Sequence, residues 1–535
     1  GTGAVGATTI AAGSTLAPGG DHAVGTLTVN GNLAFQSGAL YLVQVNPTSA
    51  SSTNVAGTAS LTGGSVQAVF APGSYVTNSY DILHAAGGLG GTKFTGVSGN
   101  VPAGFTQGLS YSTSGTDVSL NLTAVLGAPG PGGPGGPGTG GLNQSQQHIA
   151  NALNNFFNNG GALPPNFVNV FGLTGANLAN TLSLLSGEAA TGAQRGAFQL
   201  GGQFLGLMLD PFVAGRSGPG GAGGPALGFA PERAGLPDDI ALAYANVTKA
   251  PPAIFEQRWT AWGGAFGGTN RTSGDPLVVG SHDLSAQAGG VAAGLDYHVS
   301  RDIVVGAAIA GGATNWGLAQ GLGGGKSDAL QAGVYAAARS GAAYVAASLA
   351  FANHWMSTDR TSAFGDHLGA SFNAESFGGR VEGGYRFATA VGGITPYGAL
   401  QAQSFHTPTY SETDFAAGGF GLSYNSRTAS DTRGELGTRF DHAAWVDPGA
   451  ELTLRGRLAW AHDWISDPTL TAVFQALPGA SFVVNGATPV RDSALASAGA
   501  ELRLANGVTL LGQFDGEFAG RSETYTGTGT LRVNW

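Results

Sequence analysis

The stretch YTGTGTLRVNW, residues 525–535, decides the fold. Its odd positions carry Tyr525, Leu531, Val533 and Trp535 with two glycines between them, whereas its even positions carry three threonines, an arginine and an asparagine. Because side chains of a strand point alternately to opposite faces, one face is apolar or small and the other is polar. An indole suits a membrane interface, where its ring and its N–H are both satisfied. The stretch predicts either a membrane-spanning strand or the edge strand of a soluble sheet.

Composition favours β-structure in a membrane. Charged residues make up 10% of the 535 residues, well below the roughly 25% of an average soluble protein. No apolar run is long enough for a membrane helix, which needs about 20 residues. The 93 glycines suit tight turns and close-packed strands. The net charge is −10 and Lys and Arg do not cluster, so we expect no nucleic-acid partner.

Residues 1–126 are charge-poor and consist of short apolar runs separated by Gly, Asn, Ser and Pro turns. This spacing is typical of a β-sandwich or of the rungs of a β-solenoid. The motifs STLAPGG (14–20), GTLTVNGNLAF (25–35) and SYDILHAAGGLGGTKFTGV (79–97) resemble the last rungs of an autotransporter passenger. The resemblance implies a right-handed parallel β-helix that ends in a capping, autochaperone-like region. The chain begins at Gly1 without a charged region followed by an apolar run, so we expect that a signal peptide has been removed or that the sequence is a fragment.

The same segment offers little acid-base chemistry. Its carboxylates are Asp21, Asp81 and Asp117, and its histidines are His22 and His84. Neighbours on a strand point to opposite faces, so the adjacent Asp21 and His22 do not form a dyad. Glycoside hydrolysis needs two opposed carboxyl groups, and a serine hydrolase needs a serine activated by a histidine. We therefore expect no enzyme, no catalytic residue, no metal, no cofactor and no small-molecule substrate.

Residues 127–256 read as linker, helices and linker. The Gly/Pro-rich stretch 127–143 has too little apolar area to fold and predicts a flexible spacer. A helical linker follows over 144–210, with a first helix over 144–157 and a turn at the two prolines that follow it. A second flexible linker covers 211–256.

The second predicted helix spans 177–210 and is slim. Small residues dominate around 186–198, where Glu188 and Arg195 are the only charges. Such a helix can pack inside a narrow tube or against a soluble sheet. Its LSGEAATGAQ segment resembles the helix that autotransporters thread through their own barrel, and the resemblance implies that Glu188 and Arg195 lie in the lumen. The Asn pairs at 154–155 and 158–159 lie well upstream and flank a helix end, so we expect no cleavage inside the barrel.

From residue 257 onward, alternating runs predict a barrel of twelve strands. The connections between them alternate between short and mostly long, as in outer-membrane barrels with short periplasmic turns and long outer loops. The predicted strands are 257–268, 284–299, 302–315, 327–339, 342–356, 370–387, 392–406, 427–443, 451–464, 491–504, 507–519 and 524–535.

The pleat separates a lipid face from a lumen face. On two strands, alternate apolar residues such as Val345, Leu349, Leu454 and Leu458 are predicted to face lipid. A charge facing lipid at the membrane centre costs about 2–4 kcal/mol, whereas water and opposite charges solvate it in the lumen. The charged residues at the alternate positions of several strands are therefore predicted to face the lumen, where we expect them to fill and stiffen the tube rather than to catalyse. They are Arg380, Glu382, Arg386, Arg433, Glu435, Arg439, Asp441, Glu451, Arg455, Arg457, Glu501, Arg503, Asp515, Glu517 and Arg532.

Nearly the whole chain resembles a monomeric autotransporter of the type V secretion class. The resemblance implies an all-β-dominated chain with a twelve-stranded outer-membrane barrel, an α-helix in its lumen and a β-helical passenger exported to the cell surface. It implies contact with outer-membrane lipid, the barrel-assembly machinery and periplasmic chaperones, and a monomer. Tyr525, Leu531, Val533 and Trp535 would form the assembly signal. The alternatives are an adhesin anchor or porin-like barrel without secretion activity, and a barrel carrying a passenger hydrolase.

Overall fold

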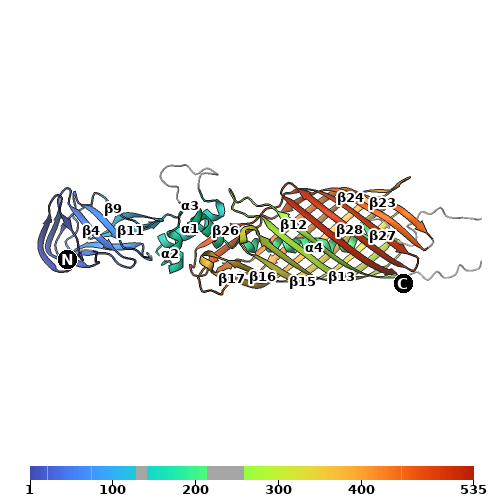
Figure 1. Ribbon diagram of the computed structural model, residues 1–535, viewed down its shortest axis with the longest axis horizontal. Helices are drawn as coiled ribbons and strands as arrows, with labels where there is room; N and C mark the ends of the chain where they lie inside the picture. Colours follow the sequence, from blue (N-terminus) through green and yellow to red (C-terminus); the bar gives the residue numbers. More distant parts are fainter. Residues whose placement is uncertain (21, 74, 128–140, 214–257, 448, 535) are drawn as a thin grey trace, which may run out of the picture.

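The computed structural model describes residues 1–20, 22–73, 75–127, 141–213, 258–447 and 449–534. Three parts lie in a row in Figure 1: an N-terminal β-region in blue, a group of helices in teal and a large barrel in green to red. Most of the two predicted linkers, 127–143 and 211–256, lies outside the described residues.

In the N-terminal part the chain passes alternately through two sheets whose successive strands pair in parallel. This parallel pairing distinguishes the region from an antiparallel sandwich. The right-handed coil and the passenger role stay predictions. The first sheet contains β1 (Ala4–Ile10), β3 (Thr26–Phe35), β5 (Ser52–Val55) and β8 (Ser79–Ala85), with β6 (Ala59–Ser60) paired to β3. The second contains β2 (Thr15–Leu16), β4 (Leu40–Val45), β7 (Ser65–Phe70) and β9 (Val97–Gly99). Two antiparallel strands, β10 (Phe105–Tyr111) and β11 (Asp117–Ala124), extend the first sheet beyond β8.

Aromatic side chains fill the space between the two sheets. Tyr41 and Phe94 stack with ring centroids 5.7 Å apart, and Phe35 meets both rings edge-on. The hydroxyl of Tyr41 is buried and lies 3.0 Å from the hydroxyl of Thr53. Alternate strand residues point inward, which is why the apolar runs of this segment form one core.

The helical part differs from its prediction in two places. The first predicted helix is confirmed as α1 (Gln144–Asn158), but α2 (Pro165–Phe171) replaces the predicted turn, with a proline in its first turn where the missing N–H costs nothing. The continuous helix over 177–210 is wrong. It is divided into α3 (Gly175–Leu185), the 3₁₀ helix η1 (Glu188–Thr191) and α4 (Gly192–Val213), and the break lies at Gly187, whose φ is 66°. No helix among the described residues has the length and apolarity required to span a membrane.

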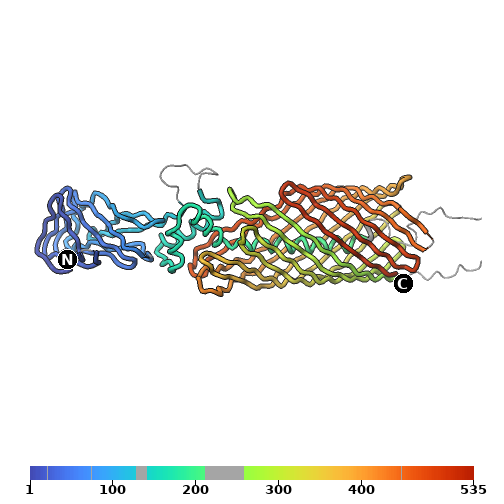
Figure 2. The backbone as a smooth tube through the Cα atoms, viewed as in Figure 1, coloured from blue at the N-terminus to red at the C-terminus, as the bar shows by residue number. Residues whose placement is uncertain are grey.

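Twelve long strands form a closed antiparallel barrel, because the last strand pairs with the first from Thr260–Asn534 to Thr272–Ser522. All twelve predicted strands are confirmed, and Figure 2 shows the strands inclined to the long axis of the barrel. The strands are β12 (Trp259–Thr272), β13 (Leu284–His298), β14 (Ile303–Leu318), β15 (Gly324–Ser340), β16 (Ala343–Thr361), β17 (His367–Tyr385), β19 (Gly392–Thr407), β23 (Arg427–Asp447), β24 (Ala450–Ile465), β27 (Asp492–Leu504), β28 (Val508–Ala519) and β29 (Ser522–Asn534).

The connections at the two barrel ends are unequal. One end, the turn end, has short turns such as 299–302, 341–342 and 505–507. The other, the loop end, carries long connections at 408–426 and 466–491, but those at 319–323, 362–366 and 520–521 are short, so the long loops are fewer than predicted. The two longest fold into an antiparallel sheet of β20 (Tyr410–Ser411), β22 (Leu422–Tyr424), β25 (Thr469–Phe474) and β26 (Ser481–Asn485). Two short strands, β18 (Phe387–Thr389) and β21 (Thr413–Asp414), extend the barrel wall.

A continuous apolar core joins the N-terminal sheets, the helices and the loop sheet. Phe167 of α2 packs against Phe420 and Phe474 of the loops, with ring centroids 4.7 Å and 5.1 Å apart. Phe171, from the same helix, stacks on Phe105 of β10. The helices are therefore held on one side by the N-terminal sheet and on the other by the barrel loops.

The outer face of the barrel is apolar. Val345, Leu349, Leu454 and Leu458, predicted to face lipid, are all exposed. Exposed aromatic side chains lie towards both ends of the strands, among them Trp355 and Trp464 near the loop end and Trp259, Tyr385 and Trp445 near the turn end. Such aromatic girdles are typical of barrels in membranes.

Candidate functional site

The lumen of the barrel holds α4, which packs against the wall formed by β13 to β17. Leu200, Phe204 and Met208 of the helix are fully buried. The wall is made of small residues because a larger side chain would collide with the helix. A Cβ at Gly312 would lie 2.9 Å from Leu200 Cδ1, and one at Gly333 would lie 2.8 Å from Met208 Sδ.

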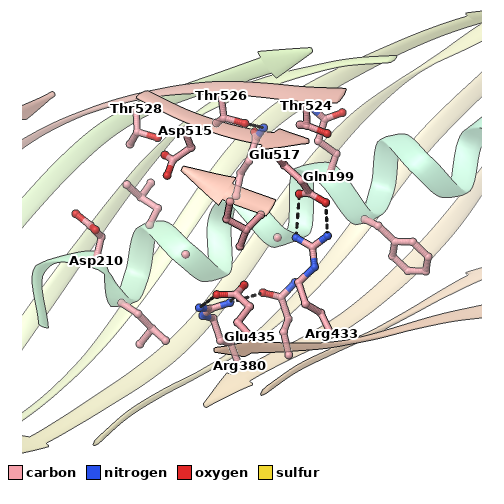
Figure 3. A pocket seen from close by; sticks show the side chains of 18 of the residues that line it. Gln199, Asp210, Arg380, Arg433, Glu435, Asp515, Glu517, Thr524, Thr526 and Thr528 are labelled. Atoms are coloured by element: carbon pink, nitrogen blue, oxygen red, sulfur yellow. Dashed lines mark hydrogen bonds and ion pairs between the residues drawn. The ribbon is translucent and has the colours of Figure 1, made fainter. Parts of the chain in front are cut away.

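On its other side α4 faces a polar cavity of about 230 Å³. Figure 3 shows Gln199 and Asp210 of the helix among the side chains of the barrel wall that line the cavity, such as Glu517 of β28 and Thr526 of β29. The helix is thus seated on the small-residue wall rather than centred in the tube, and the predicted charges gather where it leaves space.

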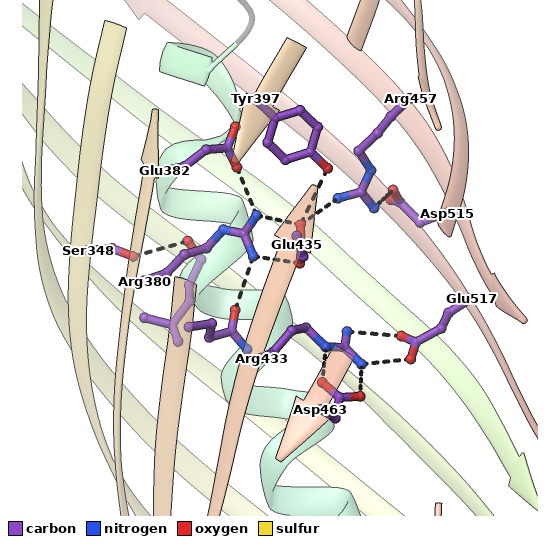
Figure 4. A network of polar contacts seen from close by, with 12 residues as sticks. Ser348, Arg380, Glu382, Tyr397, Arg433, Glu435, Arg457, Asp463, Asp515 and Glu517 are labelled. Carbon is purple, nitrogen blue, oxygen red and sulfur yellow. Dashed lines mark hydrogen bonds and ion pairs between the residues drawn. The ribbon is translucent and has the colours of Figure 1, made fainter. Parts of the chain in front are cut away.

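The first group of charges joins β17 to β23. Arg380 donates from Nη1 and Nη2 to both carboxylate oxygens of Glu435, at 2.8 Å and 2.9 Å, and to Glu382 Oε2 at 2.8 Å (Figure 4). Arg439 donates to the same Glu382 at 3.0 Å and 3.1 Å. Tyr344 completes the group by donating its hydroxyl to Glu382 at 2.8 Å. Two arginines and two glutamates therefore balance each other in a buried cluster.

A second group lies deeper towards the loop end. Arg433 donates to both oxygens of Asp463 at 2.6 Å and 2.8 Å and to both oxygens of Glu517 at 2.7 Å and 3.1 Å. Arg457 lies between the two groups, because it pairs with Asp515 at 3.0 Å and is 3.9 Å from Glu435. These contacts reach from β23 across β24 to β28, so single arginines connect strands that are not neighbours.

The remaining predicted charges lie towards the turn end. Arg455 pairs with Glu501 and reaches Asp210 on α4 at 3.3 Å, which ties the helix to β24. Arg503 lies between Glu501, at 3.5 Å, and Glu451, at 3.9 Å. Arg386 pairs with Asp441 at 2.7 Å in the same region.

Arg532 from the opening stretch pairs with Asp296 of β13 at 3.1 Å. Asp296 also accepts a bond from Tyr335, whose hydroxyl in turn accepts the Trp262 Nε1 donor at 2.6 Å. These partners of Arg532 were not among the predicted site residues. Trp262 on β12, Asp296 on β13 and Tyr335 on β15 occupy inward-facing alternate positions, which was the available signal for them. A single acid or tyrosine on a strand has no distinctive spacing, however, so it does not stand out in the sequence.

The structure separates the two charges assigned to the lumen helix. Arg195 lies on α4 inside the barrel, where it donates to Asn270 Oδ1 at 3.1 Å. Glu188 lies in η1 at the loop end and pairs with His282 of the β12–β13 connection. Glu188 therefore lies in the 3₁₀ helix before α4 rather than in α4 itself, and its assignment to the lumen stays a prediction.

The four residues predicted as an assembly signal fall into two sets. Tyr525, Leu531 and Val533 are exposed on the outer face of β29. Trp535 lies outside the described residues. Among the described residues, no group of three or more His, Asp or Glu side chains is arranged to hold a metal ion.

These features define a class of protein: a closed membrane barrel with an apolar outer face, a charged inner wall and a helix through its lumen. Residues 261–515 match the family model of the autotransporter beta-domain. This match covers most of the barrel, so the barrel is similar to an autotransporter beta-domain, which supports an outer-membrane translocator for a passenger.

Known proteins resemble parts of the chain. An extracellular serine protease of Serratia marcescens is 27% identical over 190 residues, which are 35% of this chain and only 18% of the length of that relative. The translocator domain of the autotransporter NalP from Neisseria meningitidis aligns with 56% of this chain and 95% of its own, at 15% identity and a TM-score of 0.44. The beta domain of the Bordetella autotransporter Brka aligns with 52% of this chain and 100% of its own, at 16% identity and a TM-score of 0.40.

Proposed function

We propose that the barrel exports the chain's own N-terminal part, residues 1–126, and then keeps it attached at the cell surface. The observation that carries this proposal is the path of α4, which runs inside the barrel and leads at the loop end into the helices and the N-terminal sheets. In outer-membrane barrels the long loops face outward, so a segment beyond the loop end is outside the cell. A chain with this path must have crossed the barrel.

Folding outside the membrane supplies a driving force for this export. The N-terminal sheets bury apolar side chains such as Tyr41, Val43 and Leu61 completely. Burial of apolar surface is the dominant favourable term in folding. A segment that folds outside cannot easily return through a lumen already occupied by α4, so export needs no nucleotide hydrolysis.

Deleting β29 tests the export proposal, because its loss opens the barrel at the pairing with β12. Intact cells expressing the full chain should present residues 1–126 to added protease, and cells expressing the deletion should not. Equal exposure in both strains would contradict the proposal. Detection of the deleted chain in whole-cell lysates is the control that it is made.

We also propose that the barrel-assembly machinery reads the outer face of β29 together with Trp535, and that periplasmic chaperones deliver the chain. The outward positions of Tyr525, Leu531 and Val533 support this proposal, since they present a continuous apolar edge. Trp535→Ser should lower the amount of heat-modifiable barrel in outer-membrane fractions. A normal amount would refute the role of Trp535.

The plug is the third part of the proposal. If α4 blocks the lumen, removal of residues 142–210 should raise the single-channel conductance of the purified barrel. An unchanged conductance would count against the plug and favour a barrel closed by other means. The same chain is proposed to act as a monomer, since the barrel closes on its own strands.

A further inference from the structure

Where the chain passes from α3 to α4, residues 184–192 form a neck at the loop end of the barrel. Side chains from four separate parts of the barrel surround this neck. We call them the collar, and they are His282, Trp316, Arg360, Ser362 and Tyr424. Each collar side chain is buried.

Two collar side chains bind the same carbonyl oxygen near the end of α3, that of Leu184. Arg360 Nη1 donates to Leu184 O at 2.8 Å, and the Ser362 hydroxyl donates to the same oxygen at 3.2 Å. Glu412 holds the guanidinium in place through two bonds of 2.7 Å and 2.8 Å. The last carbonyls of a helix require such partners when they are buried.

The neck bends at Gly187, where only glycine fits. Its φ of 66° lies in the left-handed region. A Cβ at this position would lie 2.2 Å from Tyr424 Oη and 2.6 Å from Leu422 Cδ1. Tyr424 Oη donates to Gly187 O at 3.3 Å, so the bend and the collar fit each other directly.

Beyond the bend, two more groups fix the chain as it enters the lumen. Both carboxylate oxygens of Glu188 bind His282, one through the backbone N–H and one through Nδ1, each at 2.7 Å. Glu188 is 2% exposed and His282 is 7% exposed. Trp316 Nε1 donates to Ala189 O at 2.8 Å.

The neck and the lumen are packed differently. Around α4 a polar cavity of about 230 Å³ remains beside Gln199, Gln203 and the charged wall, whereas Ser186, Glu188, Ala189 and Thr191 of the neck are all buried. We propose that the collar closing on the neck, rather than α4 filling the tube, is the seal that stops ions from passing through the barrel. This inference rests on the proposed plug and locates it.

The seal can be opened without removing the helix. Gly187→Ala places a methyl group against Tyr424 and strains the bend. Tyr424→Phe removes one hydroxyl and leaves the ring. Gly206→Ala is the matched control, because it adds the same methyl group to α4 at a position where a Cβ meets no atom within 4 Å. All three variants are made in the full chain, inserted into liposomes and checked for heat-modifiable mobility.

Ion conductance is then measured across bilayers that contain each chain. The loss of one buried hydrogen bond raises the open fraction about tenfold, so Tyr424→Phe should conduct well above the wild type. Gly187→Ala should also conduct above the wild type, because its methyl group collides with Tyr424, while Gly206→Ala should not. Wild-type conductance in Tyr424→Phe, or an equal rise in Gly206→Ala, would overturn the proposal. Surface exposure of residues 1–126 on cells is scored separately, so a failure of export with normal conductance would refute the proposed function and not the seal.

Discussion

Arg380 on β17 and Glu435 on β23 face each other across β19 inside the barrel, joined by two parallel bonds of 2.8 Å and 2.9 Å. Arg380 also binds Glu382, so one guanidinium bridges two buried carboxylates, and Arg439 supplies the second positive charge. A planar guanidinium suits this task because its donors match carboxylate geometry in pairs. Such a contact fixes the distance between strands that do not touch.

Arg380→Met should strongly destabilise the barrel. The variant removes the positive charge that the buried carboxylates of Glu382 and Glu435 share. Breaking a buried ion pair costs about 3–5 kcal/mol. The free energy of unfolding in urea, followed by gel mobility of the full chain, measures the loss. Arg386→Met is the control, since its side chain is 38% exposed and exposed pairs contribute about 1 kcal/mol or less. Equal losses in both variants would contradict the role given to burial.

Leu349→Arg should impair membrane insertion. The side chain of Leu349 is 64% exposed on the outer face, and an arginine facing lipid near the midplane costs about 2–4 kcal/mol. Gln287→Arg, on the outer face of β13 nearer the loop end, is the control and should fold normally. Folding yield into lipid vesicles is the measurement, and a normal yield for Leu349→Arg would show that this face does not meet lipid.

Asn158→Ala should loosen the junction between the N-terminal sheet and α1. The Asn158 amide accepts from Ala124 N at 2.7 Å and donates to Ala124 O at 3.2 Å, as a neighbouring strand would. Leaving these groups without partners costs about 1–3 kcal/mol. Hydrogen exchange of β11 should accelerate in this variant and stay unchanged in Asn151→Ala, which lies on the exposed side of the same helix. Unchanged exchange in Asn158→Ala would refute the junction.

Acid should weaken the first N-terminal sheet, because Asp117 of β11 then loses its charge. Its pKa is held below the ordinary value by a hydrogen bond from Thr116 and then by His84, whose Nδ1 lies 2.5 Å away. A lowered folded pKa adds stability above the unfolded pKa of about 3.9, and this stability is lost as the pH falls through the folded pKa. The protection of β8 and β11 amides from hydrogen exchange, relative to the intrinsic rate at each pH, should therefore fall below about pH 4 in the wild type, with a smaller change in Asp117→Asn. Identical acid dependence in the two chains would contradict this.

The barrel was predictable from the sequence because its strands obey one simple rule. Period-two alternation located all twelve strands, and the barrel closes through the pairing of β29 with β12. The lumen charges share the face that the alternation assigns to them. Their individual partners depend on the diameter and stagger of the closed barrel, which no local pattern encodes.

The features that sequence analysis missed depend on distant contacts. The stretch around Gly187 has a helical composition, and its bend is set by Tyr424 and Leu422, more than two hundred residues away. The loop sheet consists of strands as short as β20 and β22, which need one another and α1 for stability. Helix α2 is too short for its period to be recognised.

Export of the N-terminal part across the barrel is the central claim, and cysteine labelling on intact cells tests it most directly. The chain contains no cysteine, so a single introduced thiol reports one position. Thr113→Cys lies in an exposed turn of the N-terminal part, and Ser300→Cys lies in an exposed turn at the opposite end of the barrel. With a membrane-impermeant maleimide, Thr113→Cys should label on intact cells and Ser300→Cys only after the outer membrane is opened. Labelling of Ser300→Cys but not Thr113→Cys on intact cells would contradict the account.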